Sequence, residues 1–401
     1  MSQATRIYAE WMLDVEMNAP VRDVLLTVQG EVITAIQMGA QPQEADVAFA
    51  GCTLLPGLID AHVHLCFSAA STHAEVVSRL VSESEAELLR RALANAQQAL
   101  FWGITTLRDC GGCGRVPFLV RELIRSGQCA GPDVLVSGPP ITTPRGHLHY
   151  IGVPAVSATE VENQAKGLLL EEGADFLKVI VTGGNMTPES DRLGCQFDVT
   201  EIHAAVRCAE QAGRYVAGHV LNREGLRRAV LAGVRTLEHC SWRIGAQQHA
   251  FDPRVAKWMR EHGQVASLTM SAPTWRKVVP EVVEIDRHLF ADLDDRFASE
   301  RAMLDSGVGF ILHTDAGVRQ TPFGVSLIYG LRSAQLELGL SPLDCLRAVT
   351  SRAAAALGLT DRGRIQIGQR ADLLVVAGQP WHDLAALHDV RAVWCAGRRC
   401  R

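Results

Sequence analysis

Two histidines separated by one residue, His62 and His64, end an apolar run that begins at Leu54. On an extended strand alternate side chains point to the same face, so the two imidazoles converge on one point. Imidazole is a common ligand of zinc and related metals, and this spacing supplies two ligands from one strand end. An isolated pair is more often an ordinary pair of strand-end histidines, so a metal site needs further ligands downstream.

Short apolar segments downstream read as strands, and helix-patterned segments alternate with them. With the run before His62, eight strands are expected, the other seven over residues 105–109, 133–137, 176–181, 215–219, 235–239, 265–269 and 308–315. This alternation predicts an α/β fold with a parallel sheet, and eight units predict a (β/α)8 TIM-type barrel. Chemistry in such a barrel lies at the C-terminal strand ends. Five ligand-type residues fall there: His62, His64, His219, His239 and Asp315.

A lysine, Lys178, lies inside the fourth of these strands, which is apolar on both faces and reads as a buried parallel strand. A bare ammonium group in that place needs a partner or a depressed pKa. Addition of CO2 would convert the amine into a carbamate, an anion whose two oxygens can bridge two cations. The alternative is a lysine that pairs with a carboxylate of a neighbouring strand.

Composition and charge exclude several classes of protein. The chain has 401 residues, 47% of them hydrophobic, which suits a barrel of roughly 250 residues and a second unit. A net charge of −5 offers no basic field for nucleic acid. No signal-peptide core and no run of roughly 18 apolar residues is present, so we expect no membrane span. Eleven scattered cysteines favour reduced thiols in a cytoplasmic protein, and we interpret Cys110-x-x-Cys113 as loop cysteines.

Both ends of the chain alternate apolar and polar residues with short turns, as strands and hairpins do. Each end is small for an independent β domain, and neither carries ligand-type residues in the pattern described above. We therefore predict a composite β-sandwich domain from residues 1–52 and 359–401, and a barrel over residues 53–358.

Four motifs together resemble the amidohydrolase superfamily of metal-dependent hydrolases: Pro-Gly-x-x-Asp-x-His-x-His at 56–64, Lys-x-x-x-x-Gly-Gly at 178–184, Thr-Asp-Ala-Gly at 314–317, and a closing Gly-to-Leu segment at 363–373. The resemblance covers essentially the whole chain. The lysine motif is similar to that of a branch with prolidase-like dipeptidases and relatives of imidazolonepropionase. In that branch a lysine at this strand marks two-metal members, whereas imidazolonepropionase itself uses one metal.

The resemblance implies two divalent ions, with zinc expected, although manganese, cobalt and iron accept the same ligands. The implied ligands are His62, His64 and Asp315 for one ion, His219 and His239 for the other, and Lys178, as N6-carboxylysine, between them. Such a centre lowers the pKa of bound water and polarises a carbonyl group. A hydroxide bridging the metals would attack the substrate carbonyl, and Asp315 would carry its proton to the leaving amine.

Loops after the strands must supply the substrate contacts. Gly146-His147 matches a Gly-His of the branch, so we expect His147 to act in catalysis by contacting the substrate carbonyl oxygen, with His149 as its rival. Four arginines follow strand ends and could clamp a substrate carboxylate: Arg192, Arg223, Arg243 and Arg319. After His219 the chain reads Val-Leu-Asn, where relatives often carry small or aromatic residues, so their dipeptide preference does not transfer directly.

The favoured function is a binuclear hydrolase of a small-molecule amide, either a dipeptidase (prolidase-like) or a hydrolase of N-acyl amino acids or carbamates. The first alternative is a mononuclear cyclic-amide hydrolase or deaminase with Lys178 uncarboxylated. The second is a scaffold-like relative without activity, which should have lost ligands that this chain keeps. A homo-oligomer without a nucleic-acid or membrane partner is expected.

Overall fold

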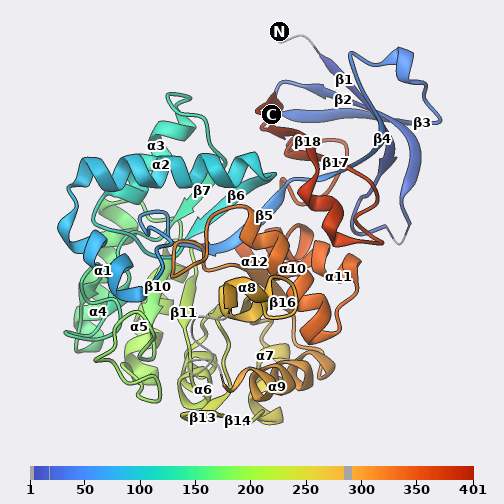
Figure 1. The fold of residues 1–401 in the computed structure, drawn as a ribbon. Coiled ribbons are helices and arrows are strands. Elements are labelled where there is room, and N and C mark those ends of the chain that lie inside the picture. Colours follow the sequence, from blue (N-terminus) through green and yellow to red (C-terminus); the bar gives the residue numbers. More distant parts are fainter. Residues whose placement is uncertain (1–3, 18, 284–290) are drawn as a thin grey trace.

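The computed structural model describes residues 4–17, 19–283 and 291–401. It contains one large sheet built from the two ends of the chain and two sheets of parallel strands between them. Helices lie around the parallel strands, and the sheet of the two ends lies to one side of them, with both termini near it (Figure 1). The predicted α/β class with parallel sheets is confirmed.

The sheet of the two ends has seven strands in the order β19-β18-β17-β4-β1-β2-β3. Their bounds are β1 Thr5–Met12, β2 Val21–Gln29, β3 Val32–Met38, β4 Val47–Pro56, β17 Leu373–Ala377, β18 Val390–Cys395 and β19 Arg398–Arg399. β4 pairs with β1 in parallel and with β17 antiparallel, which joins the two ends of the chain. Buried apolar side chains, among them Ile7, Leu54 and Leu373, form the core of this unit. A β-sandwich stays a prediction, as do the domain boundaries.

The parallel strands form a three-stranded sheet, β5-β6-β7, and a seven-stranded sheet, β16-β15-β12-β11-β10-β8-β9. Their bounds are β5 Leu58–Val63, β6 Ile104–Asp109, β7 Asp133–Val136, β8 Ile141–Thr142, β9 Val153–Pro154, β10 Leu177–Ile180, β11 Val216–His219, β12 Thr236–Glu238, β15 Val265–Thr269 and β16 Phe310–His313. A parallel bridge between Val63 and Ala316 connects the first strand with the segment after the last one. The C-terminal ends of β5 and β16 therefore meet.

Several helices begin with a side chain that satisfies free backbone N–H groups. Ser84 caps α2 and exchanges hydrogen bonds with Glu87, and Asn222 caps α6. The α-helices are α1 His73–Ser82, α2 Glu85–Phe101, α3 Val116–Arg125, α4 Ala158–Lys166, α5 Val199–Gln211, α6 Arg223–Ala232, α7 Pro253–Glu261, α8 Pro280–Val283, α9 Leu293–Asp305, α10 Val325–Leu338, α11 Pro342–Ala348 and α12 Ser351–Leu357. Shorter elements are a hairpin, β13 Arg243–Gly245 with β14 Gln248–His249, 3-10 turns at Pro42–Glu44, Ala272–Trp275 and Leu384–His388, and a π-helical turn at Gly167–Glu171.

No helix in the part of the chain that the structure describes is long and apolar enough to cross a membrane. All eleven cysteines are free thiols. Cys110 is buried and Cys113 is partly buried in the loop after β6, as the loop interpretation requires.

Candidate active site

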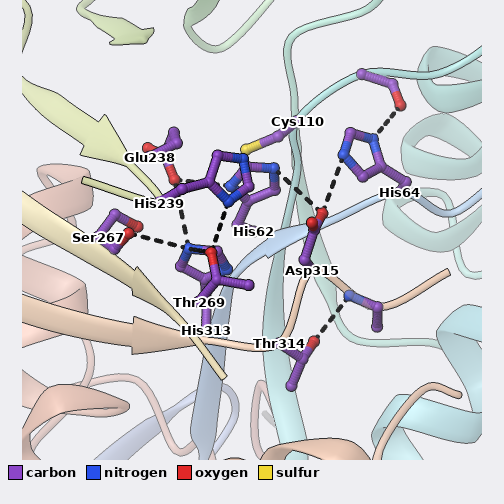
Figure 2. A network of polar contacts seen from close by, with 12 residues as sticks. His62, His64, Cys110, Glu238, His239, Ser267, Thr269, His313, Thr314 and Asp315 are labelled. Atoms are coloured by element: carbon purple, nitrogen blue, oxygen red, sulfur yellow. Dashed lines mark hydrogen bonds and ion pairs between the residues drawn. The ribbon is translucent and has the colours of Figure 1, made fainter. Parts of the chain in front are cut away.

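The two histidines of the opening motif lie at the end of β5 and are buried (Figure 2). His62 Nδ1 is 2.8 Å from Glu238 Oε2, and His64 Nδ1 is 2.7 Å from the carbonyl oxygen of Gly111. A carbonyl and an ionised carboxylate can only accept, so each Nδ1 carries the hydrogen. Each Nε2 then keeps a lone pair that can bind a cation.

Asp315 follows β16 and faces both of these nitrogens. Its Oδ1 is 3.3 Å from His64 Nε2 and 3.6 Å from His62 Nε2. The ligand atoms of the three residues all lie within 4.8 Å of one another, a spacing at which they can surround one metal ion. Asp315 has a φ of 59°, a left-handed conformation that aspartate tolerates better than most residues, and this turn directs the carboxylate back to the strand ends.

Lys178 on β10 reaches the same place. Its side chain is buried, with 1% of the residue exposed, and its Nζ lies 3.2 Å from His62 Nε2. No carboxylate of the described residues forms an ion pair with this amine, so the paired-lysine alternative finds no partner there. The amine instead points into the group of histidines, where a carbamate would also lie.

His219 ends β11 and His239 follows β12, and their ring centroids are 4.6 Å apart. His239 Nδ1 is 2.6 Å from Thr269 Oγ1, whereas the buried Nε2 of His219 has no hydrogen-bond partner in the protein. Burial holds the pKa values of His62, His219 and His239 well below the usual value of histidine. Neutral imidazole is the form that binds metals, so these donors fit divalent cations.

A buried ion pair that the sequence reading missed supports the histidines. The side chains of Arg108 and Glu238 are fully buried, and Arg108 Nη2 lies 2.7 Å from Glu238 Oε1. Burial raises the pKa of Glu238, but the charge of Arg108, together with Lys178, His313 and a hydrogen bond from Thr236, outweighs it and lowers that pKa to about 2. The ionised carboxylate therefore accepts from His62 Nδ1 at all ordinary pH values. The sequence pattern that could have indicated this pair is a charged residue within a predicted strand, which is also the pattern that indicated Lys178.

Two further residues support the ligands from behind. His313 stacks on His62 with ring centroids 4.6 Å apart, and its Nε2 lies 3.2 Å from the carbonyl oxygen of Ser267. Asp60 accepts hydrogen bonds from the backbone N–H and the hydroxyl of Thr314, beside Asp315, and burial raises the pKa of Asp60 to about 7. Neither His313 nor Asp60 points at the three-ligand cluster as a ligand in the described structure.

A cavity opens over this group, with one half at the strand ends and the other in the loops. The lining residues at or directly over the strand ends, here called the inner half, include His147, His219, His239 and Asp315. Those from the loops, the β13–β14 hairpin and α9, here called the outer half, include Arg192, Arg243, Arg319, His249, Asp292 and Arg296. The structure thus brings together all six predicted ligands, of which His219, His239 and Asp315 line the cavity, and three of the four predicted arginines. Arg223 begins α6 and lies outside this cavity.

His147 is buried over the centre, with its ring centroid 4.7 Å from that of His219. Burial lowers its pKa to about 3, and its Nδ1 has no partner in the protein. The Gly-Gly segment of the lysine motif makes room for it, because a Cβ on Gly184 would lie 2.4 Å from His147 Nε2. His149, the rival, contacts the carbonyl oxygen of Gly146 and does not line the cavity.

Comparison with known proteins decides the family. The model of the amidohydrolase family matches residues 53–400. The chain belongs to the amidohydrolase family. Among curated relatives, this amidohydrolase is 25% identical to an ochratoxinase of Aspergillus niger over 99% of its own length and 86% of the relative's. It is also 24% identical to an imidazolonepropionase of Arthrobacter sp. (strain FB24), with both chains covered completely.

Solved structures agree with this assignment. A Xaa-Pro dipeptidase with methionine bound in its active site is similar to the amidohydrolase described here with a TM-score of 0.84 and 25% identity, over 99% of both chains. The resemblance read from the four motifs is therefore confirmed, and so is the prediction of a hydrolase that acts on C–N bonds.

Proposed function

We propose that this amidohydrolase is a two-metal enzyme that cleaves an amide C–N bond of a small molecule. The observation that carries the proposal is the convergence of a buried lysine amine with four histidines and an aspartate at neighbouring strand ends. The residues that would hold the ions are His62, His64 and Asp315 for one, His219 and His239 for the other, and Lys178, as N6-carboxylysine, for both. Bound divalent ions, with zinc expected, would polarise the substrate carbonyl and acidify water.

Asp315 is the residue that would move the proton. Burial raises the pKa of this carboxyl group, but the neighbouring His64, His313 and Lys178 together outweigh it and keep the pKa below its usual value. Asp315 is therefore ionised at neutral pH and can accept a proton at its carboxylate from the attacking water. The same carboxylate lines the substrate cavity and can then donate that proton to the leaving amine.

His147 would bind the substrate carbonyl oxygen. A pKa of about 3 keeps its imidazole neutral, so one ring nitrogen donates an N–H without carrying charge. Its position beside His219 supports this role. At the outer side of the cavity, Arg192, Arg243 and Arg319 would attract a carboxylate of the substrate.

This arrangement favours substrates that carry a carboxylate next to an amide, such as dipeptides, N-acyl amino acids or related carbamates. The full-length likeness to an imidazolonepropionase keeps a second candidate, a mononuclear hydrolase of cyclic amides or a deaminase. The two candidates differ in the number of ions and in the state of Lys178.

We further infer that the parallel strands close into the eight-stranded barrel of residues 53–358. The hydrogen bond from Asp315 N to His62 O, 3.0 Å long, supports closure between the first strand and the last. We also infer that residues 1–52 and 359–401 form a composite β-sandwich domain. Free thiols support a reducing, cytoplasmic setting, and a homo-oligomer stays a prediction.

Metal analysis of wild type and Lys178→Ala, both produced with added zinc, tests the two-metal proposal. We expect two ions per wild-type chain and at most one in Lys178→Ala, with activity lost. Lys166→Ala is the matched control, because that lysine is exposed and pairs with Glu162 on α4. One ion per chain in all three proteins would contradict the proposal and favour the mononuclear candidate.

A further inference from the structure

One histidine in the outer half of the cavity, His249, has an unusual environment. His249 ends the β13–β14 hairpin, yet only 1% of its side chain is exposed. It lines the cavity together with His219, His239 and Asp315. The metal-binding proposal does not use it, and sequence reading gave no reason to single it out.

The contacts of one ring nitrogen fix the tautomer of His249. Its Nε2 is 2.9 Å from Asp292 Oδ2, and the same oxygen is 2.5 Å from Arg243 Nη2. Burial raises the pKa of Asp292, but the hydrogen bond from His249 and the charge of Arg243 keep it below its usual value, so the carboxylate is ionised. It can only accept, and Nε2 therefore carries the hydrogen. In the neutral imidazole this leaves Nδ1 as an acceptor.

That acceptor is buried and has no hydrogen-bond partner in the protein. Buried polar atoms in folded proteins are nearly always paired, so an unpaired one next to a cavity indicates a partner that enters the cavity. The partner must bring an N–H or O–H group. An ammonium group is disfavoured, since Arg192, Arg243 and Arg296 line the same side of the cavity. The like charges of Arg192 and Arg296 also contribute to lowering the pKa of Arg243, after its burial.

We propose that His249 is a specificity-determining residue whose Nδ1 accepts a hydrogen bond from the amide N–H of the substrate. The proposal rests on the proposed function, amide hydrolysis in this cavity. It assigns the substrate to the secondary amides that carry a carboxylate. N-alkylated amides, including amides of the proline nitrogen, lack this N–H and bind less well. The chain would thus differ in substrate from the Xaa-Pro dipeptidase that it resembles in structure.

Matched substrate pairs test this selectivity. N-acetyl- and N-benzoyl-L-alanine are compared with their N-methyl counterparts by kcat/KM, in the zinc-loaded wild type and in His249→Phe. We expect the wild type to favour the N–H member by about tenfold or more, the usual effect of a lost buried hydrogen bond. In His249→Phe the preference falls to within about twofold of unity. His262→Phe, at an exposed histidine on the C-terminal side of α7, is the control and keeps the wild-type preference.

Asp292→Ala gives a second test without removing the imidazole. It removes the carboxylate that holds the ring hydrogen on Nε2, so that hydrogen can move to Nδ1 and the acceptor is no longer fixed. We expect the same loss of preference with the metal content unchanged. This variant serves where His249→Phe does not fold.

Two results would overturn the inference while leaving amide hydrolysis in place. One is an equal kcat/KM for both members of each pair in the wild type, or an unchanged preference in both variants. The other is cleavage of neutral nitroanilides, which carry no carboxylate, by a protein that leaves the N-acyl alanines intact. A two-metal protein that cleaves no amide of any of these kinds would contradict the proposed function itself.

Discussion

The two halves of the cavity are built in different ways. On the inner half the ligands end strands whose neighbours fix them, and each of the two histidines on β5 has its second ring nitrogen held by a buried acceptor, Glu238 or the carbonyl oxygen of Gly111. On the outer half Arg192 and His249 come from a loop and a hairpin; Arg192 contacts Asn185 of its own loop, and His249 contacts Asp292 at the start of α9. We infer that the register of the strands positions the proposed metal ligands, whereas the conformation of the loops determines which substrate binds.

The strongest test of the inner half is Asp315→Asn. The amide keeps the shape of the side chain but cannot accept and return a proton, so we expect kcat to fall by roughly 10^2–10^4-fold. Because Asp315 is also a proposed ligand, zinc content is measured in parallel under excess zinc, so that kcat is compared at equal metal loading. Asp305→Asn, at an exposed residue at the end of α9, is the control. Near-normal turnover with both ions in place would remove Asp315 from the proton transfer.

Glu238→Gln tests whether the buried ion pair behind His62 is needed for zinc binding, as the ligands are, and for stability. The substitution leaves the buried Arg108 without its counter-charge, which typically destabilises a protein by about 3–5 kcal/mol. It also weakens the acceptor that fixes His62, for which we expect a roughly 10–100-fold loss of zinc affinity. Denaturant unfolding and competition with a chelator measure the two effects. Glu224→Gln, at a surface residue of α6 that pairs with Arg227, should change neither by much.

Gly184→Ala gives the smallest expected effect and tests the boundary between the halves. The added methyl group would lie 2.4 Å from His147 Nε2, so the imidazole must move. We expect kcat/KM to fall by roughly tenfold, on the scale of a lost substrate hydrogen bond, with metal content unchanged. Gly309→Ala, where a Cβ would meet no atom within 4 Å, is the control. An unchanged kcat/KM would mean that His147 does not bind the carbonyl oxygen.

The same division explains what could be predicted from the sequence. His62 follows from the alternation along its strand, Lys178 from a charge inside an apolar strand, and Asp315 from its place at a strand end. The structure brings the three together. His249 could not be predicted, because its burial depends on a contact with Asp292, 43 positions away across the chain. Arg223 was assigned from its place after a strand end, but it begins α6 and faces another surface.

The two residues that support the ligands, Glu238 and Arg108, could be predicted only in part. Each lies within a segment predicted as a strand, so a charge in the interior of the predicted barrel could be inferred for both, but not that they pair with each other. That pairing depends on how β6 and β12 are placed relative to each other in the interior of the fold. A local sequence pattern does not contain this information.

The sheet shared by the two ends has a consequence for how the chain is made. Thr53 Oγ1 donates to the carbonyl oxygen of Gly378, 325 positions later, and the second half of β4 pairs with β17. A ribosome that adds about 5–20 residues per second must therefore synthesise the whole parallel-strand region before β4 gains that neighbour. Until then β4 has an open edge, which invites pairing with other nascent chains. A nonsense mutation before Leu373 would make that exposure permanent, even though every proposed metal ligand had already been translated.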